Sequence, residues 1–244
     1  MIDVHCHLTE KPLVDDLDNV IKEAKNKGVK AIVTSGIGPE DCKHVLEIAD
    51  NQYVFPSLGI EPYELDGYEE VIELIRKERN RVIMIGEVGL DYYAAPRDTW
   101  EIQRRVFIEF IELSKELDKP LVIHSRSAGR YAVDILIQNK AERVIMHAFD
   151  GKPSHAERGA QHGYLFSIPP SVARSEQKQK LVKRLPLENL LLESDAPVLA
   201  PERNMVNKPS NIKVSAEWIA KLKGIKLEAV IEETEQQARE ILRI

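Results

Sequence analysis

Two hydrophobic patterns alternate along the chain. Short runs of consecutive apolar residues, such as 82–85, are typical of strands buried on both faces. Longer segments carry apolar residues three and four positions apart, which predicts amphipathic helices. The predicted strands are 2–5, 30–36, 54–58, 81–87, 120–124, 143–147, 164–167 and 190–193. The predicted helices are 15–27, 39–49, 68–79, 99–117, 130–138, 154–162, 176–185, 215–222 and 227–242.

This order of elements predicts an α/β protein with a parallel sheet covered by helices. Eight strand–helix units in 244 residues match a TIM (β/α)8 barrel, here with an extra C-terminal helix. No internal repeat or linker interrupts the pattern, so we expect a single domain over residues 1–244. A doubly wound open sheet is the alternative topology.

The composition is that of a globular protein, with 43% hydrophobic and 30% charged residues. The net charge of −6 argues against a broad basic face that grips duplex DNA, although local arginines and metal ions could still hold a few phosphates. No apolar run reaches the length of a membrane span, and the first residues lack the features of a signal peptide. These absences predict a cytoplasmic protein, and we expect a monomer or a small homo-oligomer.

Polar residues with metal-binding chemistry stand at the carboxyl ends of the predicted strands, where TIM barrels keep their active sites. Four of the seven histidines lie there, together with two acidic residues. His5 and His7 are two residues apart and should point the same way, with Cys6 on the opposite side as a small buried residue. The strand-end set is His5, His7, Glu87, His124, His147 and Asp195. His44, His155 and His162 fall within predicted helices and are assigned no chemistry.

Four imidazoles and two carboxylates suit two divalent metal ions. Mixed nitrogen and oxygen ligands favour zinc or manganese, with magnesium possible and calcium least suited. Glu87 comes from the middle of the predicted barrel and is placed to bridge the ions. Two dications balanced by two carboxylates leave a net positive charge that can bind an anionic substrate. For His5 and His7 the alternative is two polar residues that leave a strand for a turn, and buried structural pairing is equally open for Glu193.

Five motifs, in order, carry a resemblance to the TatD family of metal-dependent deoxyribonucleases, within the amidohydrolase superfamily. They are Asp3-Val4-His5-Cys6-His7-Leu8, Gly86-Glu87-Val88-Gly89-Leu90-Asp91-Tyr92, Ile123-His124-Ser125-Arg126, His147-Ala148-Phe149-Asp150-Gly151 and Glu193-Ser194-Asp195-Ala196-Pro197. The resemblance implies a TIM barrel with the six strand-end residues as metal ligands. It also implies hydrolysis of DNA phosphodiesters, as a 3′→5′ exonuclease on single strands.

Three loops depart from the family pattern. Glu61 stands where the family usually has a histidine after strand three. The segment 203–206 after strand eight is altered, and the segment 167–170 after strand seven contains two prolines. Because all three lie in loops that shape substrate contacts, they bear on the substrate more than on the reaction.

The predicted mechanism is metal-assisted phosphodiester hydrolysis. Glu87 would be shared by the two ions, and Asp195 is the candidate to take the proton of the attacking water. Arg126 could fork onto phosphate oxygens, with Arg203 and Lys208 as weaker candidates for substrate binding. Ordinary surface ion pairs are the alternative for all three.

Two further functions stay open at this point. One is hydrolysis of a small ester, lactone or amide at the same site, which the acidic charge and Glu61 favour. The other is a metal-stabilised barrel that binds a partner without catalysis. Tyr92 or Tyr93 could stack on a nucleobase, with packing against neighbouring loops as the alternative.

Overall fold

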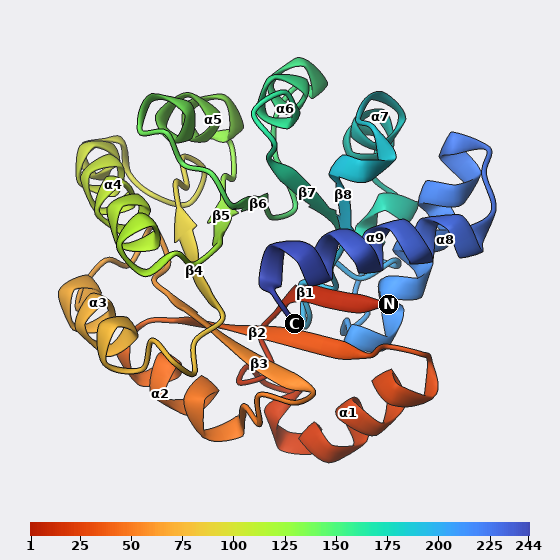
Figure 1. Ribbon diagram of the computed structural model, residues 1–244, viewed down its shortest axis with the longest axis horizontal. Helices are drawn as coiled ribbons and strands as arrows, with labels where there is room; N and C mark the ends of the chain where they lie inside the picture. The colour runs from red at the N-terminus through yellow and green to blue at the C-terminus, as the bar shows by residue number, and fades with distance from the viewer.

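The computed structural model describes all residues, 1–244, and shows eight parallel strands in the order β1 to β8 with helices around them (Figure 1). The strands are β1 (Ile2–Cys6), β2 (Ala31–Ile37), β3 (Val54–Gly59), β4 (Met84–Gly89), β5 (Leu121–His124), β6 (Val144–Met146), β7 (Leu165–Ile168) and β8 (Leu190–Leu192). Backbone hydrogen bonds from Asp195 to His5 (2.9 Å) and from His7 to Ala196 (2.8 Å) tie the end of β1 to the segment after β8. The sheet is therefore a nearly closed barrel.

Nine α-helices follow the strands. They are α1 (Leu17–Asn26), α2 (Pro39–Ile48), α3 (Tyr68–Lys77), α4 (Trp100–Leu117), α5 (Gly129–Gln138), α6 (Pro153–Ala160), α7 (Glu176–Arg184), α8 (Ile212–Lys223) and α9 (Leu227–Leu242). The predicted TIM barrel with an extra C-terminal helix is confirmed. The doubly wound alternative is excluded, because its strand order would reverse at a switch point whereas this order runs without a break.

Element boundaries differ from the predicted ones at a few places. Strand β4 begins at Met84 and continues to Gly89, whereas the apolar run predicts 81–87. Helix α8 begins at Ile212, three residues before the predicted start. None of the helices has the length and apolar character that crossing a membrane requires.

The buried apolar side chains form two clusters. The larger cluster lies between the strands and the surrounding helices. The smaller cluster takes alternate residues from the strands, such as Val33, Val122 and Ile145, and also contains Ala238 and Leu242 of α9. Helix α9 thus closes one end of the barrel, next to both chain termini (Figure 1).

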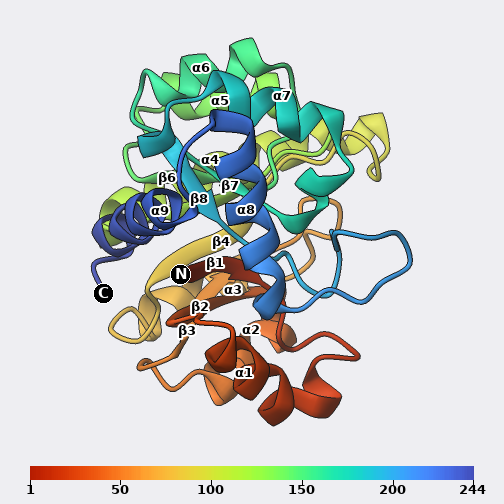
Figure 2. The ribbon, with the colours of Figure 1, turned by 90° about the vertical axis from the view of Figure 1, so that its right-hand side faces the viewer.

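The opposite end carries the strand-to-helix loops. Figure 2 shows α9 and both chain termini on one side of the molecule, and the long segment between β8 and α8 projecting from the other. Helix α9 and the smaller apolar cluster, here called the inner apolar cluster, fill one end of the barrel. Polar side chains from different strands can therefore meet only at the other end, where the strands finish, which we call the mouth.

Candidate active site

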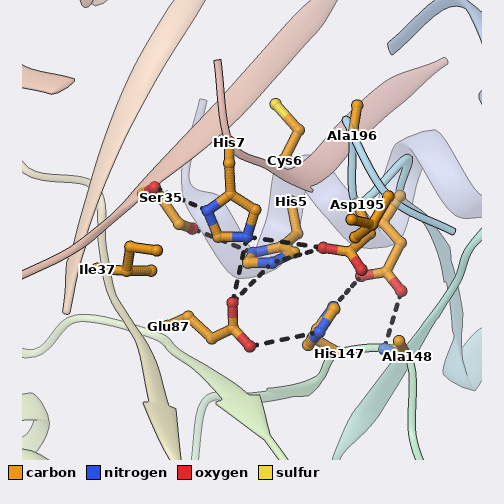
Figure 3. A network of polar contacts seen from close by, with 12 residues as sticks. His5, Cys6, His7, Ser35, Ile37, Glu87, His147, Ala148, Asp195 and Ala196 are labelled. Atoms are coloured by element: carbon orange, nitrogen blue, oxygen red, sulfur yellow. Dashed lines mark hydrogen bonds and ion pairs between the residues drawn. The ribbon is translucent and has the colours of Figure 1, made fainter. Parts of the chain in front are cut away.

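Strand β1 places two histidines at this mouth by means of an irregular register. Val4 belongs to the inner apolar cluster. Between Asp3 and Cys6, β1 advances three residues while β2 advances two, which is the signature of a β-bulge. The extra residue lets His5 and His7 both face the mouth, while Cys6 packs in the outer core and points away from them (Figure 3). The sequence prediction for these three side chains is confirmed.

A second irregularity turns Glu87 into the mouth. From Ile85 to Val88, β4 advances three residues while β5 advances two. Gly86 has φ +129°, and a Cβ at this position would lie 2.4 Å from the carbonyl oxygen of Val122. Only glycine fits there, so the local chain path that presents Glu87 depends on this residue.

The other three predicted residues, His124, His147 and Asp195, reach the mouth without a β-bulge. His124 is the last residue of β5 and His147 directly follows β6. Each lies two positions after an inward-facing residue, Val122 or Ile145, of the inner apolar cluster, so regular alternation turns both imidazoles into the mouth. Asp195 follows β8 with φ 53°, and its amide donates to the carbonyl of His5. All six predicted residues therefore meet at one rim of the barrel.

Glu87 lies between two pairs of histidines, and Figure 3 shows His5, His7 and His147 of these around its carboxylate. Its Oε2 is 3.2 Å from His5 Nε2 and 3.3 Å from His7 Nε2. Its Oε1 contacts His124 Nδ1 and is 3.4 Å from His147 Nε2. One carboxylate thus offers a separate oxygen to each histidine pair, as a ligand shared by two metal ions would.

Asp195 completes the first pair from the other side. Its Oδ1 is 3.4 Å from His5 Nε2 and 3.6 Å from His7 Nε2. The ligand atoms gather within 4.8 Å in three sets: His5, His7 and Glu87; His5, His147 and Asp195; Glu87, His124 and His147.

The buried Nε2 atom of His5 lies near oxygens of Glu87 and Asp195 but makes no hydrogen bond of acceptable geometry. A buried polar atom without a partner is costly, and a metal ion would satisfy it. The donor set and this nitrogen fit a pair of divalent ions.

A carboxylate behind His147 fixes the orientation of its ring. Glu193 Oε2 lies 3.0 Å from His147 Nδ1 and also accepts the hydroxyl of Ser167 at 2.6 Å. Its Oε1 accepts the amide of Ala148 at 2.8 Å. Because an ionised carboxylate only accepts, Nδ1 carries the proton and Nε2 is left free to face Glu87. Glu193 is thus a buried, paired carboxylate, as the sequence analysis allowed, and its partner is a histidine of the cluster.

Asp91 fixes the orientation of the His124 ring in the same way, but it contacts Nε2 instead of Nδ1. Its Oδ2 lies 2.9 Å from His124 Nε2, while Oδ1 accepts the amides of Tyr93 (2.8 Å) and Ala94 (2.7 Å). His124 is thereby held with Nδ1 toward Glu87. The sequence reasoning missed this role of Asp91, although the residue stands in the quoted motif just after strand four.

The sequence comparisons agree with this geometry. Residues 2–243 match the family described as TatD related DNase. The chain belongs to the TatD family. Human "Deoxyribonuclease TATDN3" is 42% identical over 98% of this chain and 93% of its own length. "Uncharacterized metal-dependent hydrolase YabD" of Bacillus subtilis is 33% identical over 100% and 99%.

A solved structure supports the fold. The TatD homologue YJJV from Escherichia coli superimposes with a TM-score of 0.92 at 25% identity, covering 100% of this chain and 98% of that one. Membership of the TatD family makes this chain a metal-dependent hydrolase.

The electrostatics of this TatD-family site favour positive charge. Burial disfavours protonated imidazoles, yet the carboxylates outweigh burial and raise the pKa of His5 to about 9 and that of His124 to about 10. Burial likewise disfavours ionised acids, but the surrounding histidines lower the pKa of Glu87 and of Asp195. The same field that holds protons here attracts metal cations, which compete for the same nitrogens.

The three basic residues predicted to bind substrate lie outside the cluster. Arg126 is exposed, with its guanidinium 4.0 Å from the centre of the Tyr93 ring. Arg203 is exposed on the segment between β8 and α8, without a hydrogen bond or ion pair. The ammonium of Lys208 is 2.8 Å from Glu23 Oε2 on α1. None of the three contacts the six cluster residues.

Glu61, the departure from the TatD pattern, is half-buried after β3 and accepts a hydrogen bond from Tyr63. Burial raises the pKa of Glu61, and the negative charge of Glu87 adds to this effect. The Glu61 carboxylate is therefore close enough to the six-residue cluster for the charge of Glu87 to act on it.

Proposed function

We propose that this protein hydrolyses phosphodiester bonds of DNA with two divalent ions, zinc, manganese or magnesium. The main support for this proposal is the position of the Glu87 carboxylate, because each of its two oxygens faces a separate pair of histidines. DNA as substrate is supported by the family description and by the name of the human relative.

The two metal sites would share Glu87. His5, His7 and Asp195 would hold one ion, and His124 with His147 the other. Divalent ions in such a pair lower the pKa of a water and neutralise the charge of a phosphate.

Asp195 is the proposed proton acceptor. Its Oδ1 faces His5 and His7, while its Oδ2 makes no hydrogen bond or ion pair within the protein. The lowered pKa keeps this carboxylate ionised at neutral pH. The free oxygen can therefore take the proton of the attacking water.

The proposed substrate form is a single strand degraded from its 3′ end. The net charge of −6 provides no broad basic face for a duplex. Exposed Arg126 and Arg203 would bind phosphate oxygens near the rim. Lys208 is the weaker candidate among the basic residues, because Glu23 already neutralises its charge.

A time course with a 5′-labelled single-stranded oligonucleotide tests this function. We expect a ladder that shortens one nucleotide at a time in Mn²⁺ or Mg²⁺ and no cleavage in chelator. Asp195→Asn should lower kcat at least a hundredfold. Glu232→Gln, an acid-to-amide change at an exposed position of α9 at the opposite end of the barrel, is the matched control and should cleave like the wild type. Cleavage that persists in chelator, or in Asp195→Asn, would contradict the proposal.

Glu61 favours a second candidate, hydrolysis of a small ester, lactone or amide at the same site. A carboxylate that interacts electrostatically with the cluster would repel phosphate but not a neutral substrate. Comparing kcat/KM for a panel of such compounds with kcat/KM for single-stranded DNA separates the two functions. Preference for a neutral compound would replace the nuclease assignment.

A further inference from the structure

Two adjacent tyrosines after Asp91 have different surroundings. Tyr92 packs within the loop: its ring stacks on Trp100 at 3.9 Å between centroids, and its hydroxyl accepts a hydrogen bond from Arg104 at 2.9 Å. Tyr93 is 68% exposed and contacts no other aromatic ring. Packing thus explains Tyr92, whereas an exposed aromatic side chain at the rim of an active site has no structural role of this kind.

Arg126 covers one face of the Tyr93 ring. Its guanidinium carbon lies 4.0 Å from the ring centre, within the range of a cation–π contact. The guanidinium makes no hydrogen bond or ion pair, unlike the exposed Arg76 and Arg184, which both pair with carboxylates. Arg126 therefore keeps all its N–H donors available, and the other face of the Tyr93 ring is open to solvent.

Hydrogen bonds connect the Tyr93–Arg126 pair to His124 of the six-residue cluster. The amide of Tyr93 donates to Asp91 Oδ1 at 2.8 Å, and the other oxygen of Asp91 lies 2.9 Å from His124 Nε2. The amide of Tyr92 donates to the carbonyl of Arg126 at 3.0 Å, which joins the two loops. These short connections place the Tyr93–Arg126 pair beside His124, at a fixed position relative to the cluster.

A cavity lies next to Arg126 along the chain, and its lining begins at Ser127. It has a volume of about 750 Å³ and lies between the loops after β5 and β6 and helix α7. Its lining includes the basic residues Arg130, Lys152 and Lys180, the acidic residues Asp150 and Glu176, and Tyr131. Arg130 lies 3.7 Å from Asp134 and Lys180 lies 3.5 Å from Glu176, whereas the ammonium group of Lys152 has no carboxylate partner. A basic side chain without a carboxylate partner, close to an aromatic ring, is a combination that single-strand binding grooves use.

We infer that the Tyr93–Arg126 pair is a stacking site for a nucleobase of the substrate strand. The open face of the Tyr93 ring stacks on the base next to the cleaved phosphodiester, and Arg126 donates to a phosphate oxygen of the same strand. The inference rests on the proposed function, since it takes DNA as the substrate. The pair would then separate polynucleotides from small phosphodiesters that lack a base.

Binding in chelator, where no cleavage occurs, tests the inference apart from catalysis. Fluorescence anisotropy gives Kd for a labelled oligothymidylate and for the same strand with abasic residues at its last two 3′ positions. The wild type should bind the intact strand about 5- to 150-fold more tightly than the abasic strand, the range expected for loss of a base–aromatic stack. Tyr93→Ala should abolish this preference, and Tyr93→Phe should restore it because the ring is kept.

Arg126→Ala provides a second readout, the salt dependence of Kd. Loss of one phosphate contact should make the slope of log Kd against log salt concentration shallower by about 0.7. An unchanged preference in Tyr93→Ala, or equal weakening for intact and abasic strands, would overturn the stacking site. Failure of the wild type to bind any oligonucleotide would overturn it too. Tight, base-dependent binding without cleavage in Mn²⁺ would instead refute the nuclease function and leave the stacking site in place.

Discussion

At the scale of single residues, the carboxylates behind the histidines decide what the site can bind. Glu193 accepts a hydrogen bond from Nδ1 of His147, and Asp91 accepts one from Nε2 of His124. Each leaves the opposite ring nitrogen facing Glu87. A histidine free to rotate would present either nitrogen, so these acids preorganise the ligand set before a metal ion arrives.

We therefore expect Asp91→Asn and Glu193→Gln each to weaken metal binding about 10- to 100-fold, because an amide does not fix the proton on one nitrogen. Competition with a chromogenic chelator measures this affinity. Asp150→Asn is a suitable control, because Asp150 lies on the same rim but its side chain accepts only from the amide of Ser127. Unchanged affinity in both variants would show that the two acids are merely structural.

The six cluster residues could be identified from sequence because each follows an apolar run, and a barrel brings all strand ends to one rim. The roles of Asp91 and Glu193 in orienting the histidine rings could not be predicted from sequence. Which oxygen of a carboxylate meets which nitrogen depends on loop geometry that spacing does not encode. Lys208 shows the same limit, since its partner Glu23 is 185 positions away in the chain.

At the scale of elements, two bulged strands supply three of the six residues. Regular alternation in β5 and β6 carries His124 and His147 to the mouth, as the sequence predicts. Strands β1 and β4 need an extra residue to bring their side chains inward. An apolar run such as 82–85 has the same appearance with or without a bulge, which is why the bounds of β4 were not predictable.

Gly86→Ala should disrupt the bulge in β4. The added Cβ would meet the Val122 carbonyl oxygen at 2.4 Å, and φ +129° is strained for any other residue. We expect a loss of about 2 kcal/mol or more in the free energy of unfolding and a large loss of activity, because Glu87 moves. Urea denaturation measures the first and the oligonucleotide assay the second.

Gly38→Ala is the matched control for this substitution. A Cβ at Gly38 meets nothing within 4 Å, and Gly38 is the N-cap of α2, where alanine is mildly unfavourable, so the loss in free energy of unfolding should stay below about 1 kcal/mol. Equal stability and equal activity of the Gly86→Ala and Gly38→Ala proteins would contradict the role assigned to the bulge.

At the scale of the whole molecule, one end of the barrel is closed by α9 and the other end carries the candidate active site. Helix α9 seals one end through Ala238 and Leu242, and Glu235 fastens it by bonds to Lys30 (2.9 Å) and to the amino group of Met1 (3.1 Å). Burial opposes ionisation of Glu235, but these cations outweigh it and lower its pKa to about 2. Closure therefore depends partly on a carboxylate far from the active site.

Glu235→Gln should make this contribution measurable as a function of pH. A lowered pKa stabilises the folded state above the unfolded value of about 4.5, and the effect disappears as pH falls toward 2. We expect the variant to be less stable by about 1–3 kcal/mol at pH 7, with the difference shrinking between pH 4.5 and 2. Urea denaturation across this range checks it. A difference that does not depend on pH would show that Glu235 acts through packing alone.

The central claim is that one carboxylate, Glu87, joins two metal sites. Its most direct test is the number of divalent ions bound per chain, measured by elemental analysis after loading with Mn²⁺ or Zn²⁺ and dialysis. We predict two ions per chain in the wild type and one or fewer in Glu87→Gln, with the fold retained. A single ion in the wild type, or two ions in Glu87→Gln, would contradict the shared ligand.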